Sequence, residues 1–321
     1  MSFLKEEYPE LMWDGDEKLP IVVNFGAGVD STAILVGLHQ RGIRPDYIVF
    51  SDTGAERPDI YAHIKRVNKW LATINFPQVS RVYKQVKGKE YGLADLLRDN
   101  KDIPSLAYGY KTCSIDHKIR PVEKFLRSEG VKRHIGIIGY GTGEIDRALK
   151  ALGSQQKVRD SKKRALTKFN LRVLWFPLID WKLNRDECKK LSKTVGFCTA
   201  KSSCFFCPAM RLSEIVKLRD YYPELYDEAL KIEDRFFEGD KERRIRKIEQ
   251  AKEVFGKDWQ DISKEEFIEH GLKKPSPNNT MGLGRNWSWR DKIEEYDNLP
   301  PELPFMEEWS GADMGCGCTD F

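Results

Sequence analysis

One stretch of the chain, residues 21–41, runs from an apolar strand through a glycine-rich turn into a helix. Ile21–Phe25 is a mostly apolar run typical of a strand buried on both faces. Gly26–Gly28 follows, and the helical pattern of Ser31–Arg41 ends at Gly42. A buried strand joined to a helix by so short a turn is the opening unit of a parallel sheet covered by helices. This stretch therefore favours the α/β class.

The first half of the chain repeats this alternation. Four more apolar runs are expected to be strands: residues 47–50, 79–83, 134–139 and 171–176. Helical segments such as 58–72 lie between them. We therefore predict a doubly wound α/β fold with a mainly parallel sheet and helices on both faces.

Beyond residue 180 the pattern becomes helical. Asn184 can cap a helix that runs to Thr194. Further helices are expected at 212–220, 223–237 and 240–255. The domains expected are a nucleotide-binding α/β domain (18–180), a helical cysteine-bearing region (181–272) and an irregular acidic tail (273–321).

Composition bears on the compartment and on charge. No apolar run approaches the ~20 residues of a membrane helix, and residues 1–19 resemble neither a signal nor a transit peptide, so a cytoplasmic protein without membrane contact is expected.

Residues 146–172 hold nine Lys or Arg against two acids. This basic segment suits a polyanion, either nucleotide or nucleic acid, and equally suits a solvated loop.

The glycine turn has the chemistry of an anion site. The small residues Gly26–Gly28 let a phosphate approach the backbone, and the first helical N–H groups point toward it. Ser31 and Thr32 add hydroxyl donors, and Asp30 could hold Mg²⁺ or orient a donor. The turn lacks the lysine of a Walker loop and the glycine spacing of a dinucleotide fingerprint. A purely structural turn is the alternative.

Two later strand ends carry further polar residues. Asp52, Thr53 and Glu56 follow the second expected strand, and a capping turn is the alternative reading. Gly139–Arg147 follows the fourth strand, where Arg147 suits a phosphate and a surface ion pair with Glu144 is the alternative.

Seven cysteines in a chain expected in a reducing compartment indicate metal or redox chemistry. Cys204 and Cys207 have a spacing shared by zinc, redox and iron–sulfur sites, and we expect them on the turn before helix 212–220. Cys113 is expected to begin a helix positioned by Pro121, with Lys118 nearby. Cys316 and Cys318 lie in the tail.

Five segments together resemble the PP-loop ATP pyrophosphatase superfamily, in its phosphoadenosine phosphosulfate (PAPS) reductase-like branch. Gly26-Ala-Gly-Val-Asp-Ser-Thr32 is similar to the signature Ser-Gly-Gly-x-Asp-Ser, with glycine and alanine at its first two positions. The other four segments are Ser51-Asp-Thr-Gly-Ala-Glu-Arg-Pro58, Lys111-Thr-Cys-Ser-Ile-Asp-His-Lys-Ile-Arg-Pro121, Gly139-Tyr-Gly-Thr-Gly-Glu-Ile-Asp-Arg147 and Ser203-Cys-Phe-Phe-Cys-Pro-Ala-Met-Arg211.

This resemblance implies an adenine nucleotide alpha hydrolase-like fold that uses ATP with Mg²⁺ or an adenylyl nucleotide. It implies Asp30, Ser31 and Cys113 as catalytic residues. The nucleotide-binding residues it implies are Phe25, Gly26, Ala27, Gly28, Asp30, Ser31, Thr32, Asp52, Thr53, Glu56, Gly139, Glu144 and Arg147.

The resemblance also implies a [4Fe–4S] cluster bound by Cys113, Cys204 and Cys207. Related reductases carry a Cys-Cys pair where this chain has Thr112-Cys113, so a fourth cysteine ligand does not follow. Cys198 is the nearest candidate for that position. A zinc site is the alternative.

Three functions are compatible with the resemblance. The first is the adenylation and thiolation of tRNA or DNA, served by a sulfur donor or redox protein. The second is the reduction of PAPS or adenylyl-sulfate, and the third is nucleotide binding without catalysis in a larger complex. The basic segment and the lack of a Glu-Cys-Gly-Leu-His ending favour the first.

Overall fold

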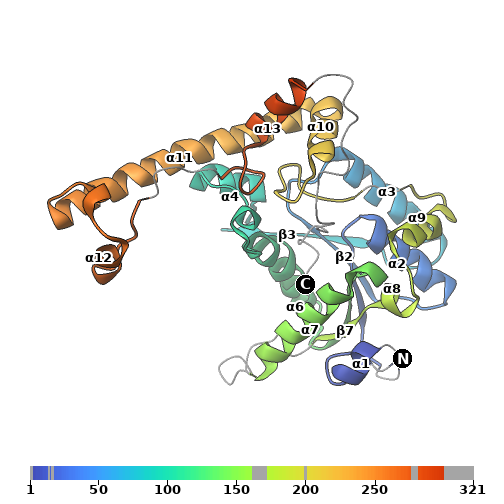
Figure 1. Ribbon diagram of the computed structural model, residues 1–321. Helices are drawn as coiled ribbons and strands as arrows, with labels where there is room; N and C mark the ends of the chain where they lie inside the picture. Colours follow the sequence, from blue (N-terminus) through green and yellow to red (C-terminus); the bar gives the residue numbers. More distant parts are fainter. Residues whose placement is uncertain are drawn as a thin grey trace. The chain divides into compact units, whose positions relative to one another are not determined.

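The computed structural model describes residues 3–13, 15, 18–160, 172–198, 201–275 and 281–299. These residues belong to two compact units, and Figure 1 labels many of their elements. The first unit holds the residues up to Gly92 and the segment Lys111–Cys204, and the second holds Leu93–Tyr110 and the residues from Phe205 onward. No described helix combines the length and apolar character needed to cross a membrane.

A five-stranded, all-parallel sheet forms the centre of the first unit, as the sequence predicted. Its strand order is β3-β2-β1-β6-β7. The strands are β1 (Ile21–Asn24), β2 (Tyr47–Asp52), β3 (Val79–Tyr83), β6 (His134–Ile137) and β7 (Arg172–Trp175). The chain adds β2 and β3 on one side of β1 and then returns to add β6 and β7 on the other. This is the strand order of a doubly wound fold, with its switch point between β1 and β6.

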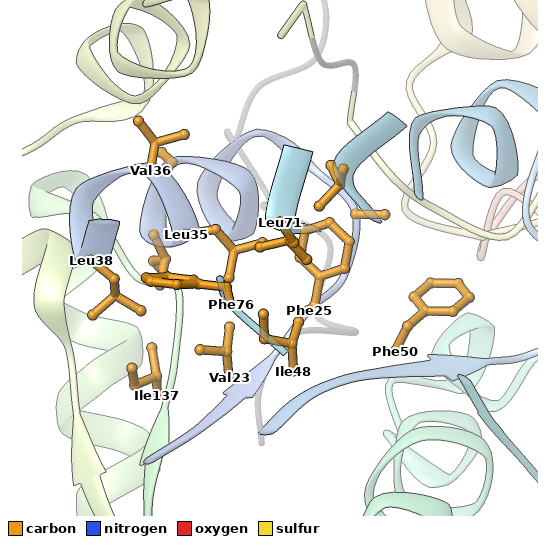
Figure 2. Packing of buried hydrophobic residues seen from close by; sticks show 14 of the residues in the cluster. Val23, Phe25, Leu35, Val36, Leu38, Ile48, Phe50, Leu71, Phe76 and Ile137 are labelled. Carbon is orange, nitrogen blue, oxygen red and sulfur yellow. The ribbon is translucent and has the colours of Figure 1, made fainter. Parts of the chain in front are cut away.

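Successive residues of the strands are buried in different clusters, which follows from the two-residue period of a strand. On one face, Val23 of β1 and Ile137 of β6 pack with α2 (Val29–Gln40) and α3 (Pro58–Thr73), as Figure 2 shows. On the other face, Val22 packs with α6 (Arg120–Ser128). Helices therefore cover both faces of the sheet.

Shorter elements complete the first unit. α9 (Arg185–Lys193) packs on α2, so the chain stays with the sheet beyond residue 180, where the nucleotide-binding domain was expected to end. The remaining elements of this unit are α1 (Phe3–Glu7), the hairpin β4 (Gln85–Val86) and β5 (Lys89–Glu90), α5 (Thr112–Ser114), η2 (Ile115–Ile119), η3 (Thr142–Glu144), α7 (Ile145–Asp160) and α8 (Pro177–Asp180).

The second unit is helical, and its central element corrects one prediction. Residues expected to form two helices, 223–237 and 240–255, form the single helix α11 (Pro223–Phe255). Gly239, which falls between the two expected helices, lies inside the helix, where an added Cβ would lie 2.6 Å from the Cβ of Lys101. The glycine therefore allows close packing against the end of α4 (Leu93–Asn100) rather than ending the helix.

The segment after residue 273 is more ordered than the predicted irregular tail. It contains α13 (Trp289–Asp297), which is fixed to α11 by the buried carboxylate of Glu233. That carboxylate accepts hydrogen bonds from the backbone N–H groups of Leu283 and Trp289 at 2.8 and 2.9 Å and from the Ser288 hydroxyl at 3.0 Å. The unit also contains η1 (Ser105–Tyr108), α10 (Leu212–Tyr221), η5 (Trp259–Asp261) and α12 (Lys264–Glu269).

The packing of α2 gives a stability prediction. A Cβ at Gly37 would lie 2.3 Å from the ring of Trp181, which is itself held edge-on by Trp175. We expect Gly37→Ala to lower the free energy of unfolding by about 1–3 kcal/mol in urea titrations, the usual effect of overpacking. Gly153→Ala in α7 is the matched control, because its nearest contact would be 3.8 Å away. Alanine gains helix propensity at both sites, so equal stability of the two variants would contradict the predicted clash.

Candidate functional site

The glycine turn connects β1 to the first turn of α2. Gly28 is the N-cap residue, and the Ser31 hydroxyl lies 3.2 Å from its backbone nitrogen. Ala27 has a φ of 57°, a left-handed conformation that costs a non-glycine residue about 1–2 kcal/mol. Strained backbone of this kind is concentrated in sites that hold a ligand.

Asp30 lies in the first turn of α2 beside an arginine that the sequence analysis did not identify. Arg185 Nη1 lies 3.4 Å from Asp30 Oδ2. Arg185 begins α9, whose N-terminus is fixed by hydrogen bonds from two backbone N–H groups to the Asn184 side chain. Burial raises the pKa of Asp30, and Arg185 opposes that rise. The Asn184 cap was predicted from the sequence, but the partner of Arg185 was not.

The segment after β6 meets the glycine turn. A Cβ on Gly139 would lie 3.6 Å from Asp30 Cβ and 3.7 Å from the backbone nitrogen of Ser31. Glu144 and Arg147 form an ion pair, as the alternative reading of this segment expected. Both also act on the pKa of Asp30, Glu144 raising it and Arg147 lowering it. Residues more than 100 positions apart therefore share one electrostatic environment at the switch point.

Asp52, predicted to bind nucleotide, is engaged by its own unit. Its side chain is 1% exposed. It accepts hydrogen bonds from the Gly54 backbone at 2.7 Å, from the Tyr61 hydroxyl at 2.9 Å and from Arg81 Nε at 2.7 Å. Hydrogen bonds to a buried carboxylate fix its position. Asp52 thus holds in place the turn that contains Thr53 and Glu56.

Residues 201–204 form a second wall beside the glycine turn, and the sequence analysis did not assign Ser202 to the site. Cβ atoms built on Gly26 and Gly28 would lie 3.8 and 3.0 Å from the Ser202 hydroxyl. Arg57 fixes one end of this segment by donating to the Lys201 carbonyl at 3.1 Å. Cys204 fixes the other, through a bridge to Glu56 and a 3.2 Å contact between its sulfur and the Thr53 hydroxyl.

The cysteines have different surroundings. Cys113 lies in α5 at the start of a helical run that continues through Pro121, and Cys204 and Cys207 lie just before α10, as predicted. Burial raises the pKa of the Cys204 thiol, and Cys113 raises it further while Lys118 lowers it. Cys188 is buried in the core, where burial raises its pKa to about 12.

The cysteines predicted to bind a metal belong to both units. Among the described residues, no group of three or more His, Cys, Asp and Glu side chains is arranged to hold a metal ion. Cys204 interacts with Cys113 inside the first unit, whereas Cys207 belongs to the second. Cys198 is exposed, and Cys316 and Cys318 lie outside the described residues. The iron–sulfur cluster and its zinc alternative remain predictions.

Comparisons with known proteins leave the family open. No known family profile matches the chain. An uncharacterized protein of Methanocaldococcus jannaschii is 26% identical over 231 residues, which cover 71% of this chain and 43% of that protein. The chain therefore matches less than half the length of this relative.

The buried histidines give a pH prediction. Burial lowers the pKa values of His63, His117 and His134 to about 4. An unfolded histidine has a pKa near 6.5, so acidification protonates the unfolded chain first. The stability that these neutral side chains contribute is complete above about pH 6.5 and is lost as the pH falls toward 4, by up to about 1.4 kcal/mol per pH unit for each histidine.

Urea titrations from pH 7.5 to 4.5, referenced to pH 7.5, would measure this slope. His63→Gln, which keeps an acceptor near the Thr32 hydroxyl 3.0 Å away, should reduce the slope by the share of one histidine. An unchanged slope in this variant would show that His63 is not held neutral by burial.

Proposed function

We propose that the protein binds ATP or an adenylyl nucleotide at the carboxyl edge of its sheet and adenylates a nucleic acid, as a step in sulfur transfer. One observation carries the proposal: the turn after β1 and the segment after β6 meet at the switch point of a doubly wound sheet. Open α/β sheets bind their ligands in this crevice.

The groups at this crevice suit a polyphosphate. The first-turn N–H groups of α2 and its positive dipole end favour an anion. Arg185 and Arg147, which both act on Asp30, supply positive charge for a departing pyrophosphate. The hydroxyls of Ser202 and Ser31 both lie next to the turn.

The reaction that fits these groups is attack by a substrate oxygen on the α-phosphorus of ATP. The new bond joins that oxygen to the α-phosphorus, and the bond to the bridging oxygen of the β-phosphate breaks, releasing pyrophosphate. Arg147 and Arg185 would stabilise the charge that develops on the leaving group. A hydrosulfide-level sulfur donor would then displace AMP from the adenylated substrate.

Mg²⁺ would supply further charge neutralisation between the phosphates. The carboxylate of Asp30 is the described group best placed to hold it, because it lies at the opening of α2 beside Ser31. Arg185 would retain Asp30 in its ionised form by opposing the effect of burial on its pKa.

Asp30 provides the first test. We expect Asp30→Ala to reduce ATP-dependent pyrophosphate release by about 100-fold or more, because a transition-state contact of this kind is worth several kcal/mol. The control is Asp186→Ala, which removes an exposed carboxylate from the first turn of α9. Melting curves would verify folding, and assays would use tRNA and DNA as acceptors.

Pyrophosphate release at the wild-type rate by a folded Asp30→Ala variant would contradict the assignment of the glycine turn to the nucleotide site. Sulfite formation from PAPS without pyrophosphate release from ATP would favour the reductase instead. Nucleotide binding without either product would favour the non-catalytic component.

Ser202 provides a second test, because its hydroxyl lies where a phosphate on the glycine turn would meet it. We expect Ser202→Ala to weaken ATP binding about tenfold, the effect of losing one hydrogen bond to a charged group. Ser202→Thr keeps the hydroxyl and should restore most of the affinity. Ser154→Ala, at an exposed position of α7, serves as the control for calorimetric titration with ATP. Equal affinities for Ser202→Ala and the wild type would remove Ser202 from the site.

A further inference from the structure

The middle of α11 carries a concentrated positive charge. Residues 241–247 contain five Lys or Arg and one Glu. They lie inside one unbroken helix, drawn in orange in Figure 1. A helix fixes the spacing of its side chains, so these charges form a rigid array rather than a flexible basic loop.

Three of the cations share one side of the helix. Lys241, Arg244 and Lys247 follow one another at intervals of three residues and therefore share one side, with a rise of about 4.5 Å between neighbours. We call these three residues the α11 basic stripe. Glu242, Glu249 and Glu253, at intervals of seven and four, lie together on another side. These three acids lie away from the stripe, whereas Asp240, four residues before Arg244, lies on the side of the stripe and is 3.9 Å from Arg243.

The other two cations of this section already have structural roles. Arg243 donates to the Lys101 carbonyl at 3.1 Å, and its guanidinium lies 5.7 Å from the centre of the Phe236 ring. Arg246 acts on Glu242, whose pKa is lowered chiefly by its hydrogen bond with Lys101. They help to join α11 to α4 and to balance the neighbouring acid.

The stripe cations have no such partner. Lys241 and Lys247 are exposed and Arg244 is half-buried. None of the three forms an ion pair or hydrogen bond with another residue in the described ranges. Like charges on adjacent turns destabilise a helix by a few tenths of a kcal/mol each, roughly 0.2–0.5. A polyanion would remove this repulsion, and the stripe would in turn displace counterions condensed on the polyanion.

We propose that the α11 basic stripe binds the phosphate backbone of a nucleic acid. This inference deepens the proposed function, on which it rests, by assigning a surface to the nucleic-acid substrate. A phosphate backbone fits the stripe because its negative charges repeat along a line, as the cations do. Contacts of this kind position a nucleic acid without reading its sequence.

The test uses a triple variant, Lys241→Gln with Arg244→Gln and Lys247→Gln, in the full chain. Its control is Lys189→Gln with Lys190→Gln and Lys193→Gln, which removes the same charge from exposed positions of α9. Fluorescence anisotropy would follow binding to a labelled DNA duplex of about 24 base pairs between roughly 50 and 200 mM salt. Circular dichroism melts would establish that both variants fold.

We expect the stripe variant to reduce the slope of log K against log salt by about 2 to 3, since each lost duplex phosphate contact removes roughly 0.9. Its affinity at low salt should fall at least about tenfold, whereas the control should keep most of the wild-type slope. The same change of slope in both variants would show that the effect depends on net charge alone, and this result would overturn the proposal. No change in the stripe variant, or no binding by the wild type, would also overturn it.

ATP binding separates this proposal from the proposed function. The stripe variant should retain the wild-type affinity for ATP in calorimetric titration, because the stripe contains none of the residues assigned to the nucleotide. A flattened salt dependence in a protein whose wild type binds no nucleotide would leave the stripe standing and overturn the nucleotide site. Normal ATP binding with an unchanged salt dependence would support the nucleotide site and overturn the proposal for the stripe.

Discussion

The parallel pairing of β1 with β6 is the constraint on which the candidate site depends. Val22 aligns with Gly136 and Val23 with Ile137, and this register brings the turn after β1 level with the segment after β6. Gly139 then lies so close to Asp30 and Ser31 that a Cβ added to it would be in van der Waals contact with both residues. A one-residue slip would turn every β6 side chain to the other face of the sheet, so core packing enforces the register that aligns the site.

Hydrogen bonds of buried polar groups hold the segments near the switch point in place. The carboxylate of Asp52 is surrounded by three donors, and the segment that contains Ser202 is held at Lys201 and at Cys204. A buried carboxylate is tolerable only when its hydrogen bonds are made, and these bonds leave the turn little freedom. Hydrogen bonds of buried groups thereby hold two segments near the turn after β1 in place.

Charge is arranged differently in the two units. In the first, Asp30, Glu144, Arg147 and Arg185 form a mixed cluster in which each acid lies near a cation. In the second, the three cations of the α11 basic stripe form no ion pair within the described ranges, and Lys241 and Lys247 are exposed. Mixed clusters suit a small ligand whose charge changes during a reaction, whereas a stripe of one sign suits an extended polyanion.

The sequence by itself determined the five strands, the sheet class, the turn after β1 and the placement of the cysteines before α10. Each depends on a local signal, such as apolar runs, glycine between strand and helix, and capping residues. It did not predict that α11 continues through Gly239. Nor did it predict that Asp52 accepts hydrogen bonds from Arg81 and Tyr61. The proximity of Arg185 and Ser202 to the glycine turn was also not predicted. Those outcomes depend on packing and on electrostatic contacts between residues distant in the chain. Only the tertiary structure decides them, because no local propensity encodes which side chain will lie opposite another.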